Sequence, residues 1–132
     1  MNPGVTNKSF IFNEKINVQC INDLYGNDYI YLQEVFGTVL GEYGTLIENI
    51  FEQYASHNIP GLKAAVHKMK PIFGFVGLLS MQHQCQQFED NCQPSSPFDM
   101  LVNNYNALRH NLIASKLLIE EEKRKLELFN SQ

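Results

Sequence analysis

The sequence has no tryptophan, only three cysteines, and no apolar run that approaches the roughly 20 residues needed to span a bilayer. Its start, MNPGVTNKSF, has neither a basic cluster nor a long apolar segment and so does not match a secretory signal peptide. Cys20, Cys85 and Cys92 are odd in number and fit no zinc-ligand spacing, which favours a reducing compartment. We therefore expect a cytoplasmic protein without a membrane partner.

An excess of positive charge is also missing. The chain has 10 Lys and Arg against 14 Asp and Glu, a net charge of −4, which argues against a nucleic-acid partner. With 132 residues, 44% of them hydrophobic, and only modest glycine and proline contents, the composition is that of one folded domain. We predict a flexible N-terminal tail over residues 1–13 and the folded domain over 14–132.

Apolar residues recur at steps of three and four, and no convincing strand pattern is present. A short helix is expected before Gly26, with Ile16, Cys20 and Leu24 on one side. Four longer amphipathic helices follow, joined by short connections. Their apolar stripes are Leu32, Phe36, Val39, Tyr43, Leu46 and Ile50; Leu62, Ala65, Met69, Ile72, Phe73 and Val76; Leu78, Met81, Cys85, Phe88 and Cys92; and Leu101, Tyr105, Leu108, Leu112, Ser115, Ile119, Leu126 and Phe129.

Short connections favour antiparallel neighbours, so the predicted fold is all-α: an antiparallel up-down-up-down four-helix bundle with a short extra N-terminal helix. Helix starts are expected at Asn27 or Asp28, at Asn58 with Pro60, and at Ser96 with Pro97 and Asp99. Gly77 is expected to end the third of the five helices. We interpret Gly37, Gly41 and Gly44 as sites of close packing, and the late EEEKRKLE segment as a solvated face.

His67 stands on the outer face of its helix. At about 100° per residue, the apolar stripe from Leu62 to Val76 is centred almost opposite to it. Small residues, cations and some apolar surface share the histidine's side, which predicts a docking face. This face comprises Lys63, Ala64, Lys68, Pro71, Gly74, Phe75 and Leu78.

This setting suits phosphoryl transfer. A neutral imidazole is a competent nucleophile near pH 7. A phosphate on its nitrogen would be negatively charged, and Lys70, one helical turn further on, could pair with it. An open position lets the active site of another protein close over the ring, and no second catalytic group is evident, as expected for a carrier.

The segment AVHKMKPIFGFVGL resembles the signature of histidine-containing phosphotransfer (HPt) domains of two-component phosphorelays. That signature is a helical histidine, a lysine three residues later, and a Val-Gly-hydrophobic segment that ends the helix. His67, Lys70, Val76, Gly77 and Leu78 match it in register. The segments YLQEVFGTVLGEYGTLIENIFEQYASHN and CQQFE resemble the family's preceding and following helices, so the likeness covers residues from about 15 to 115.

The resemblance implies a phosphoryl carrier with no cofactor of its own, because Mg²⁺ would belong to the partner. His67 is the implied phosphoacceptor, Lys70 the phosphate-stabilising residue and Glu89 the imidazole-orienting residue. The implied partners are receiver domains of response regulators or a hybrid histidine kinase. We expect a monomer, which is either a stand-alone carrier or a domain of a larger sensor kinase.

Pro71 departs from the family pattern, which usually has glycine after the lysine. A proline there cannot donate to the carbonyl of His67, and its ring crowds that carbonyl. We predict a kink or widened turn at this point, which puts the geometry of Lys70 in doubt more than the role of His67.

Three other interpretations stay open. A metal site could use His57, His67, His83 or His110, although bundle metal sites use inward faces and His67 points outward. A helical adaptor could bind a partner through the same outer face without chemistry. The chain could also be a phosphotransfer fold that has lost the carrier role.

Overall fold

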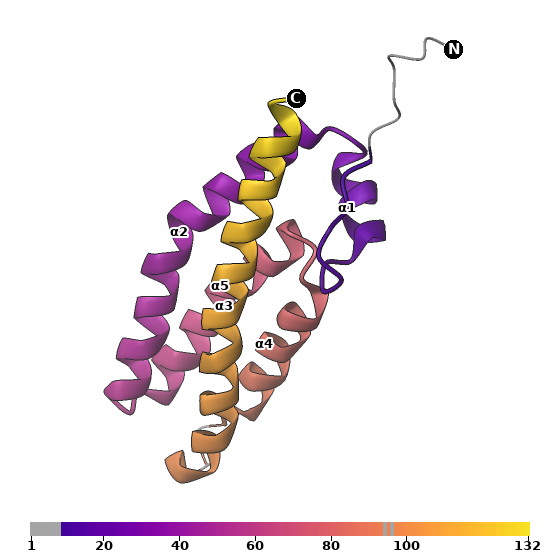
Figure 1. The fold of residues 1–132 in the computed structure, drawn as a ribbon. Coiled ribbons are helices and arrows are strands. Elements are labelled where there is room, and N and C mark those ends of the chain that lie inside the picture. The colour runs from indigo at the N-terminus through magenta and orange to yellow at the C-terminus, as the bar shows by residue number, and fades with distance from the viewer. Residues whose placement is uncertain (1–8, 94, 96) are drawn as a thin grey trace.

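The computed structural model describes residues 9–93, 95 and 97–132, and over these residues the chain is helical, with no strand (Figure 1). Its elements are α1 (Val18–Tyr25), α2 (Tyr29–Ala55), α3 (Ile59–Phe75), α4 (Leu79–Asn91), the short 3-10 helix η1 (Phe98–Leu101) and α5 (Val102–Asn130). The helices α2 to α5 form the antiparallel bundle, and α1 lies at the end where α3 turns into α4 (Figure 1). The predicted fold class is confirmed.

Helix boundaries follow local capping chemistry. The side chains of Asn17, Asp28 and Asn58 each accept a hydrogen bond from a backbone N–H in the first turn of α1, α2 and α3. Gly77, with φ of 73°, takes the left-handed conformation that ends α3. At the start predicted for the last helix, Ser96 lies outside the described residues, and η1 leads into α5.

Most of the predicted stripes form the core. Phe36, Tyr43 and Phe73 are fully buried, and the Tyr43 hydroxyl donates to the carbonyl of Leu112 across the bundle. Cys85 and Cys92 are buried among these apolar side chains, as predicted. Over the described residues, no helix is long and apolar enough to cross a membrane.

Some positions differ from the predicted pattern. On α2, Ile47 is buried and Leu46 only half-buried, and on α5 Phe129 is half-buried. In the N-terminal helix, Leu24 is exposed and Cys20 half-buried, while Ile21 is fully buried. The prediction placed Ile16 in the same helical register, but α1 begins only at Val18, so the buried side of α1 is shifted.

The predicted flexible tail is wrong at Phe10, Phe12 and Asn13, which contact the bundle, whereas the side chain of Ile11 is 80% exposed; residues 1–8 lie outside the described part of the chain. Phe10 is buried and contacts the rings of Phe12, Tyr29 and Phe129. The segment has no helical periodicity in the sequence, because single aromatic side chains make its contacts with the bundle. The packed domain therefore includes Phe10 and does not begin at residue 14.

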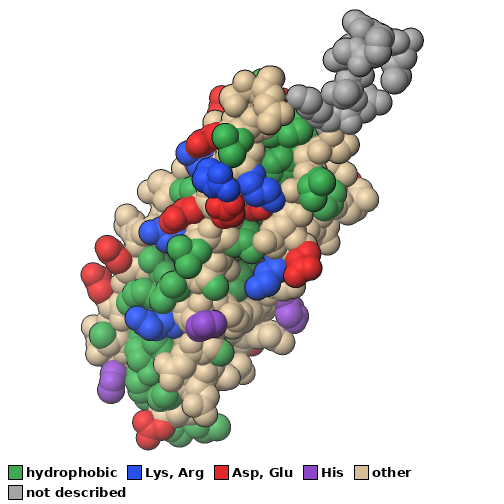
Figure 2. Space-filling view, in the orientation of Figure 1, with side chains coloured by type: hydrophobic (Ala, Val, Ile, Leu, Met, Phe, Trp, Pro, Cys, Tyr) green, Lys and Arg blue, Asp and Glu red, His purple; other side chains and the backbone are tan. Residues whose placement is uncertain are grey.

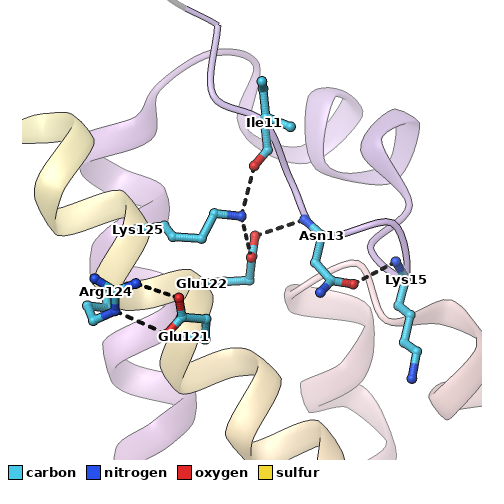
Figure 3. Close-up of polar contacts among 7 residues, drawn as sticks. All are labelled: Ile11, Asn13, Lys15, Glu121, Glu122, Arg124 and Lys125. Atoms are coloured by element: carbon cyan, nitrogen blue, oxygen red, sulfur yellow. Dashed lines mark hydrogen bonds and ion pairs between the residues drawn. The ribbon is translucent and has the colours of Figure 1, made fainter.

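A buried carboxylate fixes the same segment to α5 (Figure 3). Glu122 is 1% exposed; its Oε2 accepts from the backbone N–H of Asn13 at 3.2 Å, and its Oε1 lies 2.7 Å from Nζ of Lys125. Lys125 also donates to the carbonyl of Ile11 at 3.0 Å. Glu122 thus departs from the solvated face predicted for EEEKRKLE, whereas Glu121 and Arg124 form an exposed ion pair.

The N-terminal part of the chain also closes the end of α3. The last carbonyls of a helix lack partners within the helix. Here the hydroxyl of Tyr25 donates to the carbonyl of Phe75 at 2.7 Å, and the N–H of Asn17 donates to the carbonyl of Gly77 at 2.8 Å. Ile21 packs directly against Gly77. Residues 16–25 therefore hold the C-terminal end of α3 in place.

The three glycines of α2 do not all lie close against a neighbouring helix. A Cβ added at Gly41 or Gly44 would meet nothing within 4 Å, so the close-packing interpretation is wrong at these two positions. At Gly37 a Cβ would lie 3.3 Å from Cε of Lys123, a flexible side-chain atom. The helix therefore has two glycines that it does not need for packing.

The Gly44→Ala substitution should raise the free energy of unfolding by about 0.5–1 kcal/mol, because alanine is the better helix former and finds open space. Urea unfolding followed by circular dichroism measures this. The matched variant Gly77→Ala should lower stability, since Gly77 has φ of 73° and its Cβ would lie 3.0 Å from Ile21. A destabilised Gly44→Ala protein would contradict this account of α2.

Candidate functional site

His67 lies on the solvent-facing side of α3. Its side chain is 69% exposed, while Val66 and Met69, its neighbours along the helix, are fully buried. The predicted direction of the histidine is therefore confirmed. The periodicity of α3 accounts for it, because the buried side of the helix packs against α2 and α4.

Glu89 reaches this imidazole from α4. Its side chain is only 6% exposed, and its Oε1 lies 2.7 Å from Nδ1 of His67. Its Oε2 lies 2.9 Å from Nζ of Lys70 and forms an ion pair with it, although no aligned hydrogen bond to this oxygen is present. The three residues that the sequence resemblance singled out are thus in mutual contact.

This contact determines which ring nitrogen is available. A carboxylate only accepts hydrogen bonds, so Glu89 selects the tautomer with the hydrogen on Nδ1 of His67. The lone pair is then on Nε2. Over the described residues, Nε2 has no hydrogen-bond partner, and the ring projects into solvent. The site therefore presents one oriented nucleophilic nitrogen to an approaching molecule.

Lys70 lies on the Nδ1 side of the ring. Its Nζ is 3.5 Å from Nδ1 of His67 and 2.5 Å from Oε1 of Gln86, whose amide nitrogen donates to Asp90 at 2.9 Å. Sequence reasoning missed Gln86. Its position three residues before Glu89 places both on one face of α4, and this spacing could have identified it.

Pro71 does not end the helix, since α3 continues through it to Phe75. The predicted kink stays a prediction, but Lys70 still reaches Glu89, so the proline leaves the lysine beside the imidazole. Pro71 and Lys68 line one wall of a hollow of about 460 Å³ between α3 and α2. The other lining residues are Gly41, Glu42, Thr45, Leu46, Ile72 and Phe75.

Most of the predicted docking residues share the face of His67. Lys63, Ala64, Lys68 and Pro71 are exposed, Phe75 is 50% exposed and Gly74 is half-buried beside Gln82.

Leu78 is a correction, because it is 4% exposed and belongs to the core. The angular projection assumed that the helix continues to Leu78, whereas α3 ends at Phe75 and Gly77 reverses the chain.

The thiols near the site are neutral near pH 7. Burial raises the pKa of Cys85 to about 12 and that of Cys92 to about 11. In the described ranges, no three His, Cys, Asp or Glu side chains are arranged to hold a metal ion. His57 contacts the ring of Phe98, and among the described residues no histidine other than His67 contacts Glu89.

Comparison with known proteins agrees with this geometry. The family model described as "Hpt domain" matches residues 34–116, and the chain belongs to this family of phosphotransfer domains. The HPT domain of the Hpt sensor hybrid histidine kinase from Shewanella has a similar fold, with a TM-score of 0.68 and 17% identity over 81% of this chain and 92% of that one. No curated protein matches the sequence significantly. The matched segment contains α3 and α4 with His67, Lys70 and Glu89.

Proposed function

We propose that this chain is a phosphoryl carrier of a two-component phosphorelay, and that His67 is its phosphoacceptor. The observation that carries the proposal is the exposed imidazole of His67, held through Nδ1 by the buried carboxylate of Glu89. This arrangement orients Nε2 toward solvent, where the active site of a partner can close over it. Membership of the phosphotransfer family supports the same role.

The transfer requires few groups from this chain. The lone pair of Nε2 attacks the phosphorus of an aspartyl phosphate, a P–N bond forms, and the P–O bond to the aspartate breaks with its electron pair on the carboxylate. Lys70 then turns toward the phosphoryl oxygens, which attract its ammonium group. A second receiver aspartate reverses the step. Mg²⁺ belongs to the receiver in this scheme, and this chain needs no cofactor.

The proposed partners are receiver domains of response regulators or of a hybrid histidine kinase. The docking face consists of Lys63, Ala64, Lys68, Pro71, Gly74 and Phe75 around His67. The half-exposed ring of Phe75 and the neighbouring hollow over Pro71 and Leu46 give this face apolar surface that a partner can cover. We propose a cytoplasmic monomer that binds neither nucleic acid nor membrane.

An adaptor that uses the same face without chemistry is the alternative. It explains the apolar hollow but gives no reason for a buried carboxylate to fix the tautomer of an exposed histidine.

Incubation with a ³²P-phosphorylated receiver domain should give this chain an acid-labile, alkali-stable label. His67→Gln should remain unlabelled with an unchanged circular dichroism spectrum, because the substituted residue is exposed. The matched variant His83→Gln removes another exposed histidine, on α4, and should be labelled like the wild type. Binding of the receiver without any label on the wild type, with several receivers, would favour the adaptor and contradict the carrier.

The Phe75→Asp variant should lower the rate of labelling at limiting receiver concentration by about tenfold or more, because it places an unpaired charge in the docking face. The matched control is Leu117→Asp on α5, whose side chain is 61% exposed. The face that α5 presents to the viewer in Figure 2 mixes apolar and charged side chains. Leu117 lines a hollow on α5 together with Arg109 and Ile113. Equal labelling rates for Phe75→Asp and wild type would show that the partner docks elsewhere.

A further inference from the structure

Glu89 is a carboxylate at a position where the neutral amide of a glutamine could also hold the imidazole by a hydrogen bond. A glutamine oxygen can accept a hydrogen bond from Nδ1–H, but only a carboxylate compensates positive charge on the ring. Here the carboxylate is 6% exposed and lies 2.7 Å from Nδ1. At this distance, the carboxylate can directly compensate a positive charge that the ring acquires.

The charge on the ring changes during the proposed reaction. The nucleophilic form that the proposed transfer requires is a neutral imidazole, with hydrogen on Nδ1 facing Glu89 and a lone pair on Nε2. After Nε2 forms the P–N bond, the ring with its Nδ1 hydrogen is a cation. When the phosphoryl group leaves, the P–N electron pair returns to Nε2. The leaving group is neutral imidazole if Nδ1 has kept its hydrogen, and the far poorer imidazolate anion if it has not.

Lys70 shares the same carboxylate in the unphosphorylated protein. Its ammonium lies 2.9 Å from Oε2 of Glu89, so the charge of Glu89 is balanced while the ring is neutral. A phosphoryl group on Nε2 attracts the ammonium and draws it from Glu89, and the carboxylate is then left to the cationic ring. Glu89 thus has a cationic partner in both states: Lys70 while the ring is neutral, and the ring itself once Nε2 is phosphorylated.

Among the described residues, no other anionic group contacts the imidazole of His67. On α3 the charged neighbours are the cations Lys63 and Lys68, and on α4 the other acid is Asp90, which contacts Gln86 and not the ring. The buried thiols of Cys85 and Cys92 are neutral near pH 7. From α2, Tyr43 is neutral as well, since burial raises the pKa of its hydroxyl.

We propose that Glu89 is a positioning residue that keeps phosphorylated His67 protonated on Nδ1, so that the phosphoryl group remains readily transferable at and above neutral pH. The proposal rests on His67 as the phosphoacceptor. It goes beyond that role because it assigns the lability of the phosphorylated form, and its pH dependence, to one carboxylate.

The test uses phosphoramidate, which phosphorylates histidine chemically and needs no receiver domain. The rate of phosphate loss from the labelled, folded protein is measured from pH 5 to 10. For the wild type, the rate should fall as pH rises through a midpoint at which Nδ1 loses its hydrogen. For Glu89→Gln, that midpoint should lie about one pH unit or more lower, which makes phosphate loss about tenfold slower at pH values above both midpoints.

Asp90→Asn is the matched control, because it removes one negative charge from the neighbouring position of α4 without a contact to the imidazole. Its profile should coincide with that of the wild type. Coincident midpoints for Glu89→Gln and wild type would overturn the proposal. So would an equal downward shift in both variants, since the effect would then arise from net charge and not from the contact with Nδ1.

A second measurement requires no variant. The ³¹P resonance of the phosphorylated wild type is titrated against pH in the folded state and in 8 M urea, and the proposal predicts the higher midpoint in the folded state. Equal midpoints would overturn it even if Glu89→Gln fails to fold. Because both measurements start from chemically labelled protein, a failure of transfer from receivers would count against the proposed carrier function and leave this result interpretable.

Discussion

The contact between the carboxylate of Glu89 and Nδ1 of His67 joins the two helices that form the site. One partner is 6% exposed and the other 69%, so a rigid, buried group fixes an exposed and reactive one. Removing a partner from a buried charge costs about 1–3 kcal/mol or more. This cost stabilises the alignment of α3 with α4 in which Glu89 contacts His67. The orientation of the nucleophilic nitrogen thus follows from the packing of the bundle.

The rest of the bundle preserves this register. The buried side of α3 includes Val66, Met69 and Phe73, which fixes the rotation of the helix. At its C-terminal end, Tyr25 and Asn17 satisfy carbonyls of α3 and of the following turn. The N-terminal segment is itself tied to α5 through the buried Glu122 (Figure 3). Segments that lie outside residues 34–116 therefore support the helix that carries the histidine.

Much of this architecture can be predicted from the sequence, because helical periodicity is strong in α2 to α5. The outward direction of His67 follows from the same periodicity, and Lys70 and Glu89 follow from the family resemblance. Leu78 could not be placed this way, since an angular projection holds only while the helix continues. The burial of Phe10 and Glu122 depends on contacts between distant parts of the chain, which no local pattern records.

The central claim is that Glu89 holds the hydrogen of the His67 imidazole on Nδ1, so that the phosphoryl group is bound at Nε2. It is tested most directly by a long-range ¹H–¹⁵N correlation spectrum of the imidazole, recorded before and after phosphorylation by a receiver domain. The account predicts hydrogen on Nδ1 before the reaction, and afterwards a P–N bond at Nε2 with the hydrogen still on Nδ1. Phosphate on Nδ1 of His67, or on a different side chain, would contradict it.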